Sequence, residues 1–460
     1  MNLTNEQIIN QAINLHIQGN ISEAFKYYKY LINQGFENHD LFSNYGAILQ
    51  SIGELEKAEL SIRKAIELNP KIGNAHYNLG ITLKSLGKLE EAESSTRNAI
   101  KLNPNDAEAH SNLGSILIDL GRLEEGESST RKAIQLNPND AAAYSNLGGI
   151  LKDLGKLQES ENYYSKAISL NPNEINFKMN RSKLLFQREK FEEALKDSDS
   201  CNTEESRTQS LIVLYALGRI DEIYKRIEKT SKIDEQNISL AAFSAFISES
   251  EKKSTANNFC KNPLSFLYFS NLKFHIENYD PFIKEIINDL KDLATVWDPS
   301  NKATKNGFQT PAHINLFLNS PKNISHLQSI ILNELDKYYM KFNTENCSYI
   351  KKWPAKKDLN GWHVVLKKQG YQESHIHPAG WLSGVIYLKV VPPLNDNEGA
   401  IEFSLNGVNY SHINSPQLTH QPKVGDIIFF PSSLHHRTIP FSTNTDRIVI
   451  AFDLLPNHND

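Results

Sequence analysis

The chain has 460 residues, more than one hydrophobic core usually serves, so two or more domains are expected. Its net charge is −5, without the basic surplus that is typical of nucleic-acid-binding proteins. No run of about 18 apolar residues predicts a membrane span, and the N-terminus does not resemble a secretory signal. Three scattered cysteines, Cys201, Cys260 and Cys347, form neither a disulfide framework nor a zinc pattern, so we expect a cytoplasmic protein.

A repeated pattern dominates the first part of the chain. Prolines recur at a step of 34 residues, each inside a Leu-Asn-Pro triplet: Pro70, Pro104, Pro138 and Pro172. Two sets of glycines keep the same step: Gly46, Gly80, Gly114 and Gly148, and Gly53, Gly87, Gly121 and Gly155. Such a fixed period indicates a solenoid, in which stacked units bury a continuous core that none could bury alone.

Each repeat predicts two helices. In the unit that contains Gly80, this glycine and Ala92 are small enough for the two helices to cross closely, and Gly87 ends the first helix. These residues resemble the tetratricopeptide repeat, clearly over residues 39–174 and in part over 5–38 and 175–205. Two departures are Glu189 in place of a loop glycine, and Thr96 and Thr130 in place of a large aromatic residue.

One polar position also recurs with the period: Asn44, Asn78, Asn112, Asn146 and Asn180. In the tetratricopeptide family this position lies on the concave face. The resemblance therefore implies a peptide-binding groove, in which each Asn could bond the backbone of an extended protein or peptide partner. The alternative is that these Asn side chains only solvate or cap the first helix.

The pattern changes beyond the repeats. Residues 240–275 predict a terminal helix pair that caps the solenoid, and residues 281–297 and 321–342 predict two amphipathic helices with a loop and a short strand between them. After residue 348 the apolar period falls to two, which predicts strands at 362–368, 383–390, 399–405, 425–431 and 447–453. Short strands without long helices between them indicate a sandwich or jelly roll with two helices outside.

Histidines concentrate in this C-terminal part. His375 and His377 are two residues apart, which would place both rings on one face of a strand, and His435 and His436 follow the strand 425–431. A His-x-His pair with one distant histidine can form a facial triad that leaves metal positions open. Arg447 begins the last predicted strand and could pair with a carboxylate.

Together these residues resemble the 2-oxoglutarate- and Fe(II)-dependent dioxygenases of the prolyl-hydroxylase-like branch. The matching segments are ESHIHPAGWLSGVIYLKV, GDIIFFPSSLHHRTIP and DRIVIAFD. The resemblance implies Fe(II) held by His375, His377 and His436, with His436 a better match than His435. It also implies 2-oxoglutarate held by Arg447 with Tyr387 lining its pocket, and ascorbate as a candidate reductant.

Two residues depart from the dioxygenase pattern. His377 stands where a carboxylate usually ligates the iron, and it either ligates as a third imidazole or does not coordinate. Val449 stands where a serine often assists the arginine. Two alternatives therefore stay open: an interaction scaffold with an inactive barrel, and a cupin-like metal site on the same fold.

The expected architecture is multidomain. An all-α superhelical tetratricopeptide solenoid (residues 1–235) precedes capping helices and a linker (236–280) and a double-stranded β-helix, or jelly-roll, domain with flanking helices (281–460). The expected function is hydroxylation of a protein or peptide substrate that the repeats present.

Overall fold

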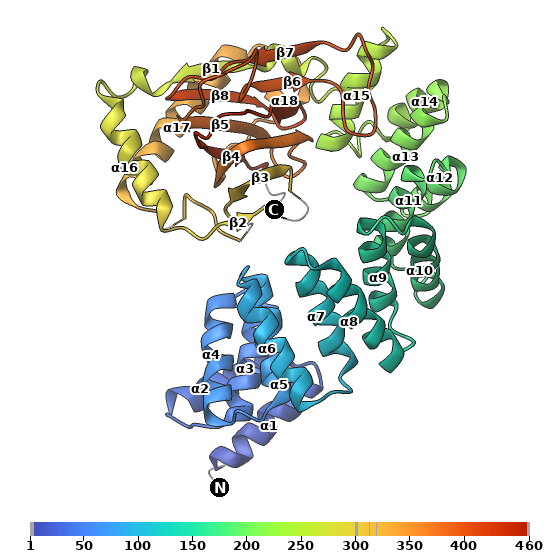
Figure 1. Ribbon diagram of the computed structural model, residues 1–460, viewed down its shortest axis with the longest axis vertical. Helices are drawn as coiled ribbons and strands as arrows, with labels where there is room; N and C mark the ends of the chain where they lie inside the picture. Colours follow the sequence, from blue (N-terminus) through green and yellow to red (C-terminus); the bar gives the residue numbers. More distant parts are fainter. Residues whose placement is uncertain (1–3, 300–301, 312, 319, 458–460) are drawn as a thin grey trace. The chain divides into compact units, whose positions relative to one another are not determined.

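The computed structural model describes residues 4–299, 302–311, 313–318 and 320–457 (Figure 1). The chain forms two compact units, Met1–Leu184 and Leu185–Asp460. Within the described ranges, no helix is both long enough and apolar enough to cross a membrane.

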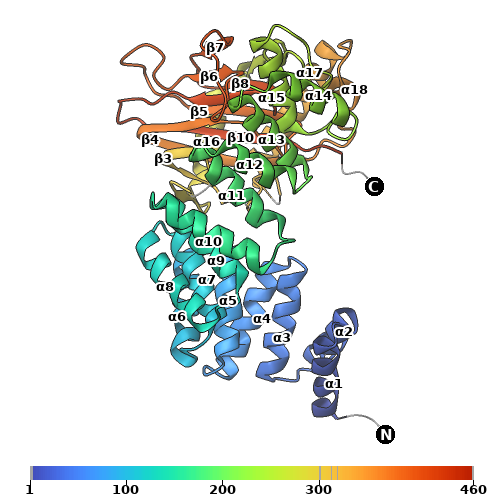
Figure 2. The ribbon, with the colours of Figure 1, turned by 90° about the vertical axis from the view of Figure 1, so that its right-hand side faces the viewer.

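The first unit is built from helical hairpins that follow one another in chain order (Figure 2). Its helices are α1 (Asn5–Ile17), α2 (Ile21–Asn33), α3 (His39–Ser51), α4 (Leu55–Leu68), α5 (Gly73–Ser85), α6 (Leu89–Leu102), α7 (Ala107–Asp119), α8 (Leu123–Leu136), α9 (Ala141–Asp153), α10 (Leu157–Leu170) and most of α11 (Ile175–Gln187). The predicted solenoid is therefore confirmed.

The small residues act where the helices of a hairpin cross. A Cβ added at Gly80 would lie 2.2 Å from the Thr96 hydroxyl oxygen, and one added at Gly148 would lie 2.9 Å from the Tyr164 ring. Thr96 is fully buried, so a threonine fills this position in place of an aromatic ring. Gly87 takes a left-handed φ of 70°, which ends α5 without the strain that a side chain would add.

A ladder of ion pairs follows the same period along the second helices. Glu59 accepts from Arg63 of its own helix at 2.9 Å and from Lys88 of the next repeat at 2.7 Å. Two further glutamates repeat this arrangement: Glu93 with Arg97 and Arg122, and Glu127 with Arg131 and Lys156. Because each glutamate binds cations from two repeats, the ladder joins neighbouring hairpins as a charge network.

The second unit combines helices with one large antiparallel sheet. Its helices are α12 (Phe191–Asp199), α13 (Glu204–Ala216), α14 (Ile220–Thr230), α15 (Ile238–Ser250), α16 (Tyr279–Lys291), α17 (Lys322–Phe342) and α18 (Ser348–Lys351), with 3₁₀ turns η1 (Pro263–Phe266) and η2 (Leu272–Phe274). Its strands are β1 (Tyr268–Asn271), β2 (Val296–Trp297), β3 (Thr304–Gln309), β4 (Leu359–His375), β5 (Leu382–Lys389), β6 (Ile401–Ser404), β7 (Gln417–His420), β8 (Asp426–Pro431), β9 (His435–Thr438) and β10 (Arg447–Leu454).

The sheet runs in the order β1-β8-β5-β10-β4-β9-β6-β7, and it curls around a pocket. Alternate residues of its strands enter two cores. On β5, Ile386 and Leu388 pack with α16 and α17, whereas Val385 and Tyr387 belong to a core that also contains Phe243 of α15. Both faces are therefore covered, which explains the nearly continuous apolar run in β5. The predicted order of solenoid and β domain is confirmed. The β domain is a curled antiparallel sheet, and its double-stranded β-helix form stays a prediction.

Several predicted elements differ in detail. Only the first of the two helices expected over residues 240–275 forms, as α15, and the rest becomes η1, β1 and η2. The helix expected over 281–297 ends at Lys291 as α16, and its last two predicted residues form β2. The expected short strand is β3, which comes before the loop rather than after it. The domain boundaries at residues 235 and 280 stay a prediction; α12–α15 belong to the same compact unit as the sheet.

Candidate active site

Three histidines meet at one end of the curled sheet. His375 is the last residue of β4, and its cross-strand partner in β9 is His436, with ring centroids 4.3 Å apart. His377 lies beyond the strand, where its backbone N–H donates to the Ser432 carbonyl at 3.0 Å. One ring nitrogen from each of the three histidines lies within 4.8 Å of the others. The expectation that strand alternation aligns His375 with His377 is wrong, because β4 ends at His375 and the following turn places His377.

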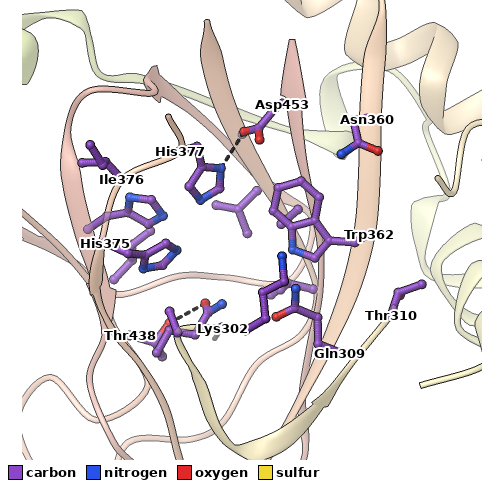
Figure 3. Close-up of a pocket in the computed structure, with 18 of the residues that line it drawn as sticks. Lys302, Gln309, Thr310, Asn360, Trp362, His375, Ile376, His377, Thr438 and Asp453 are labelled. Atoms are coloured by element: carbon purple, nitrogen blue, oxygen red, sulfur yellow. Dashed lines mark hydrogen bonds and ion pairs between the residues drawn. The ribbon is translucent and has the colours of Figure 1, made fainter. Parts of the chain in front are cut away.

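Each of these rings is oriented through its Nδ1 atom. His375 Nδ1 donates to the Glu373 carbonyl at 2.7 Å, and His436 Nδ1 donates to the Leu434 carbonyl at 3.2 Å. His377 Nδ1 instead donates to the Asp453 carboxylate at 2.6 Å (Figure 3). In a neutral ring whose Nδ1 carries the hydrogen, Nε2 keeps a lone pair, and this is the arrangement that metal-binding histidines need.

The surroundings of His375 and His436 keep these two rings neutral. Burial, and secondly the nearby His377, lowers the pKa of His375 to about 3. Burial also holds the pKa of His436 well below its ordinary value. At neutral pH neither ring is protonated on the nitrogen that would bind a metal, so the donor set fits a divalent transition metal.

The histidines line a cavity of about 410 Å³, and Arg447 and Tyr387 line the same cavity. Arg447 is 2 % exposed, and its guanidinium carbon lies 4.9 Å from the centre of the Tyr387 ring. Among the described residues nothing accepts from Arg447 Nε, from Arg447 Nη1 or from the Tyr387 hydroxyl, whose polar neighbour is the guanidinium itself. Burial raises the pKa of Tyr387 to about 12, so its hydroxyl stays a donor. Three buried donors without acceptors fit a ligand carboxylate.

The wall opposite His375 and His377 is polar. Figure 3 shows Lys302, Gln309 and Trp362 extending into the cavity from the other side, with Asn360 beyond them. The Gln309 carbonyl oxygen accepts from the Thr304 hydroxyl at 2.8 Å, which turns the amide N–H group away from Thr304. Within the described ranges, no carboxylate pairs with Lys302. This wall therefore offers several hydrogen-bond donors to a molecule in the pocket.

The remaining histidines of this part of the chain have other partners. His435 faces away from the triad and bonds the Tyr410 hydroxyl at 2.8 Å, so the structure groups His436 and not His435 with the other two ligand candidates. His363 is buried and bonds Thr310 at 2.8 Å, and His420 lies 3.2 Å from Asp426.

The five repeated asparagines lie on the first helices of their hairpins, α3, α5, α7, α9 and α11, and all are half-buried. Asn112 donates to the Thr96 hydroxyl of the preceding repeat at 3.3 Å. This bond gives Asn112 a structural role between repeats, and whether the five residues bind a peptide stays a prediction.

Asp453 is the residue of the site that the sequence did not single out. It lies on β10, on the face that Arg447, Val449 and Ala451 also direct into the cavity. Counting in steps of two from Arg447 would have placed it there.

The fold and the site define a helical solenoid followed by a β domain with a histidine cluster beside a pocket that contains buried donors without acceptors. Residues 360–453 match the family described as "Putative 2OG-Fe(II) oxygenase", where 2OG denotes 2-oxoglutarate. Residues 39–72, 73–106, 107–140 and 141–174 match tetratricopeptide repeat families. The chain thus joins a tetratricopeptide array to a domain of the 2-oxoglutarate/Fe(II) oxygenase type.

A search of curated proteins gives no match. Among solved structures, PilF of Pseudomonas aeruginosa is 20% identical with a TM-score of 0.40, covering 45% of this chain and 96% of its own. A tetratricopeptide repeat protein from Parabacteroides merdae is 21% identical with a TM-score of 0.41, covering 49% and 91%. YrrB, described as a TPR protein with an unusual peptide-binding site, is 22% identical with a TM-score of 0.34, covering 42% and 97%.

Proposed function

We propose that this protein is a non-haem Fe(II)- and 2-oxoglutarate-dependent dioxygenase that hydroxylates a protein or peptide substrate. The observation that carries the proposal is Arg447, a buried cation beside the histidine cluster without an anionic partner among the described residues. A buried charge normally has a partner, because removing it from water is costly. The distal carboxylate of 2-oxoglutarate has the charge and the planar shape to be that partner.

Each residue of the site has a role in this proposal. His375, His377 and His436 would hold Fe(II) through Nε2, and Arg447 would bind the cosubstrate with the Tyr387 hydroxyl. Val449 lies opposite Tyr387 on the neighbouring strand and its side chain has no donor, so we assign the second bond to the tyrosine. Bound iron would supply the oxidation, in which O₂ and 2-oxoglutarate give succinate, CO₂ and a hydroxylated substrate.

The polar wall supports a substrate that is rich in hydrogen-bond acceptors. Lys302, Gln309 and Trp362 all present N–H donors toward the cavity, whereas the Asp453 carboxylate already accepts from His377 and Ser383. Backbone carbonyls and carboxylate side chains of a peptide provide such acceptors. The repeat array would present this peptide through the groove that we assign to Asn44, Asn78, Asn112, Asn146 and Asn180.

The two alternative functions, a cupin-like metal site and an inactive scaffold, give Arg447 no role. A cupin-like metal site needs no carboxylate cosubstrate, and an inactive scaffold has no reason to keep a buried guanidinium beside three oriented histidines. Both would leave the cation without a ligand, which is an unfavourable state for an interior residue.

The proposal is tested by binding and turnover in the full chain. Titration with Mn(II), a redox-silent substitute for iron, followed by 2-oxoglutarate should show metal-dependent cosubstrate binding, and Fe(II) in air should give succinate. His436→Ala should abolish all three signals. His435→Gln is the matched control, because it changes the neighbouring histidine that faces Tyr410, and it should preserve them. A native protein that binds neither metal nor 2-oxoglutarate would contradict the proposal.

A further inference from the structure

The three histidines of the cluster differ in one respect. Two of them donate their Nδ1 hydrogen to a neutral backbone carbonyl, at Glu373 and at Leu434. His377 alone donates to a carboxylate, that of Asp453, at the short distance of 2.6 Å. His377 is also the residue that replaces the usual anionic ligand of the family.

Asp453 is held firmly in place. It is 7 % exposed, and its Oδ1 atom accepts from the Ser383 hydroxyl at 2.7 Å, while Ser383 in turn bonds Ser432 at 2.8 Å. A Cβ added at Gly380 would lie 2.9 Å from the carboxylate carbon, so the backbone closes over this group. The carboxylate therefore has one position, directed at His377.

The charge of Asp453 has few compensating groups. In the part of the chain that the structure describes, no lysine or arginine pairs with it, and its contact with His377 is an ion pair only when that ring is protonated. Ser383 and Ser432 are neutral. A buried carboxylate in such surroundings is costly unless a cation lies near. A metal ion on the far side of the His377 ring would be such a cation.

We propose that Asp453 supplies, through the His377 ring, the negative charge that a directly bound carboxylate would otherwise give to the metal. This inference rests on the proposed function, since it assumes that His377 ligates a metal. Asp453 is then a positioning residue: it fixes the ring and makes Nε2 a stronger electron donor. In the usual pattern the carboxylate contacts the metal directly, whereas here the carboxylate of Asp453 contacts the ligand His377.

A double-mutant cycle separates this role from simple packing. Asp453→Asn keeps the shape and the bond to His377 but removes the charge, and Mn(II) affinity should fall roughly 10- to 100-fold. In a His377→Asp background the metal would have its own carboxylate ligand. In this background Asp453→Asn should increase the Mn(II) affinity, because it removes the repulsion between two adjacent carboxylates.

Two further measurements guard against a folding artefact. The midpoint potential of the bound iron should rise in Asp453→Asn, because loss of negative charge favours Fe(II) over Fe(III). Ser383→Ala removes the other bond to Asp453 without changing its charge, and it should leave this potential nearly unchanged. If Asp453→Asn alone does not fold, the Mn(II) affinities of His377→Asp and of the double variant still show whether the charge of Asp453 acts through His377.

The possible failures are distinguishable. Equal loss of affinity in both backgrounds would mean that Asp453 only packs, and unchanged affinity in Asp453→Asn would overturn the inference while the oxygenase proposal survives. Wild-type protein that binds no metal would overturn both.

Discussion

Arg447 is a buried cation whose hydrogen bonding is incomplete. Its side chain is almost fully enclosed, Tyr387 covers one face of the guanidinium, and two of its N–H groups have no acceptor among the described residues. Burial lowers the pKa of this group, yet an arginine remains charged in proteins because its ordinary pKa is very high. The free protein therefore carries an energetic cost at this position, which a bound carboxylate would relieve.

This cost makes a testable prediction at the residue scale. Arg447→Met should leave the ligand-free protein as stable as the wild type or raise its free energy of unfolding by about 1 kcal/mol or more, because a buried unpaired charge is removed. The same variant should lose the stabilisation that 2-oxoglutarate gives in a thermal melt with Mn(II).

Arg207 provides the contrast. It forms an ion pair with Asp234, which is completely buried, so Arg207→Met should destabilise the protein by about 3–5 kcal/mol. Similar destabilisation by both substitutions would show that Arg447 is a structural residue.

The sequence identified the site residues whose type and spacing are distinctive. The short spacing of His375 and His377 and the later His436 were enough to suggest a metal cluster, and Arg447 suggested an anion. Asp453 was missed because an aspartate near the end of an apolar strand has many explanations. Only the pairing of β10 with β5 and β4 brings it to His377 and Ser383.

At the scale of elements, helices were easier to predict than strands. The helices of each hairpin are set by residues close in sequence, and α17 begins and ends within one residue of its predicted bounds. The strands β1, β7 and β9 were not predicted, because each is only four residues long and two of them are polar. β4 extends to His375 because its polar second half pairs with β3 and β9, a contact that no local pattern contains.

One helix end carries measurable strain. Where Gly87 and Gly155 take a left-handed conformation after their helices, Glu189 takes the same conformation with φ of 60°. Its N–H donates to the Phe186 carbonyl, and Lys190 N–H donates to Leu185, which is the bonding pattern of the glycine turns. A residue with a Cβ costs about 1–2 kcal/mol in this conformation.

Glu189→Gly should therefore stabilise the unit Leu185–Asp460 by about 0.5–1 kcal/mol, after the greater freedom of glycine in the unfolded chain is subtracted. Gly218 ends α13 in the same way with φ of 70°, and Gly218→Ala should destabilise the same unit by about 1 kcal/mol. Denaturant titration followed by a probe within this unit measures both. A loss of stability in Glu189→Gly would mean that the glutamate side chain makes a contact worth more than the strain.

At the scale of the whole molecule, α12–α15 belong to the same compact unit as the sheet. Phe243 and Phe246 of α15 pack against Tyr410 of the sheet domain, with ring centroids 5.1 and 4.8 Å away. Ser348 and Lys352 bond Glu235, and β1 extends the sheet beside β8. Helices that read as the end of the solenoid are thus part of the core of the second unit. Periodicity alone could not show this, because it records similarity between repeats and not their neighbours.

Two fragments test this organisation. Residues 185–460 contain every residue that lines the pocket, and they should bind Mn(II) and 2-oxoglutarate with the affinity of the full chain. Residues 281–460 lack α15 and β1 and would expose the apolar surfaces that these elements cover, so this fragment should aggregate. Light scattering and calorimetric titration distinguish the two. A monomeric, ligand-binding fragment 281–460 would show that α12–α15 are dispensable.

The ion-pair ladder of the first unit bears on how such an array can change in evolution. Glu59, Glu93 and Glu127 each accept from a cation in their own helix and from one in the following repeat. Because the partners recur at the same step, loss or duplication of one whole repeat would create a junction in which every glutamate again meets two cations. Unequal crossing-over can therefore change the number of repeats while every inter-repeat ion pair is kept. An insertion out of step with the period would separate a glutamate from the cation of the following repeat.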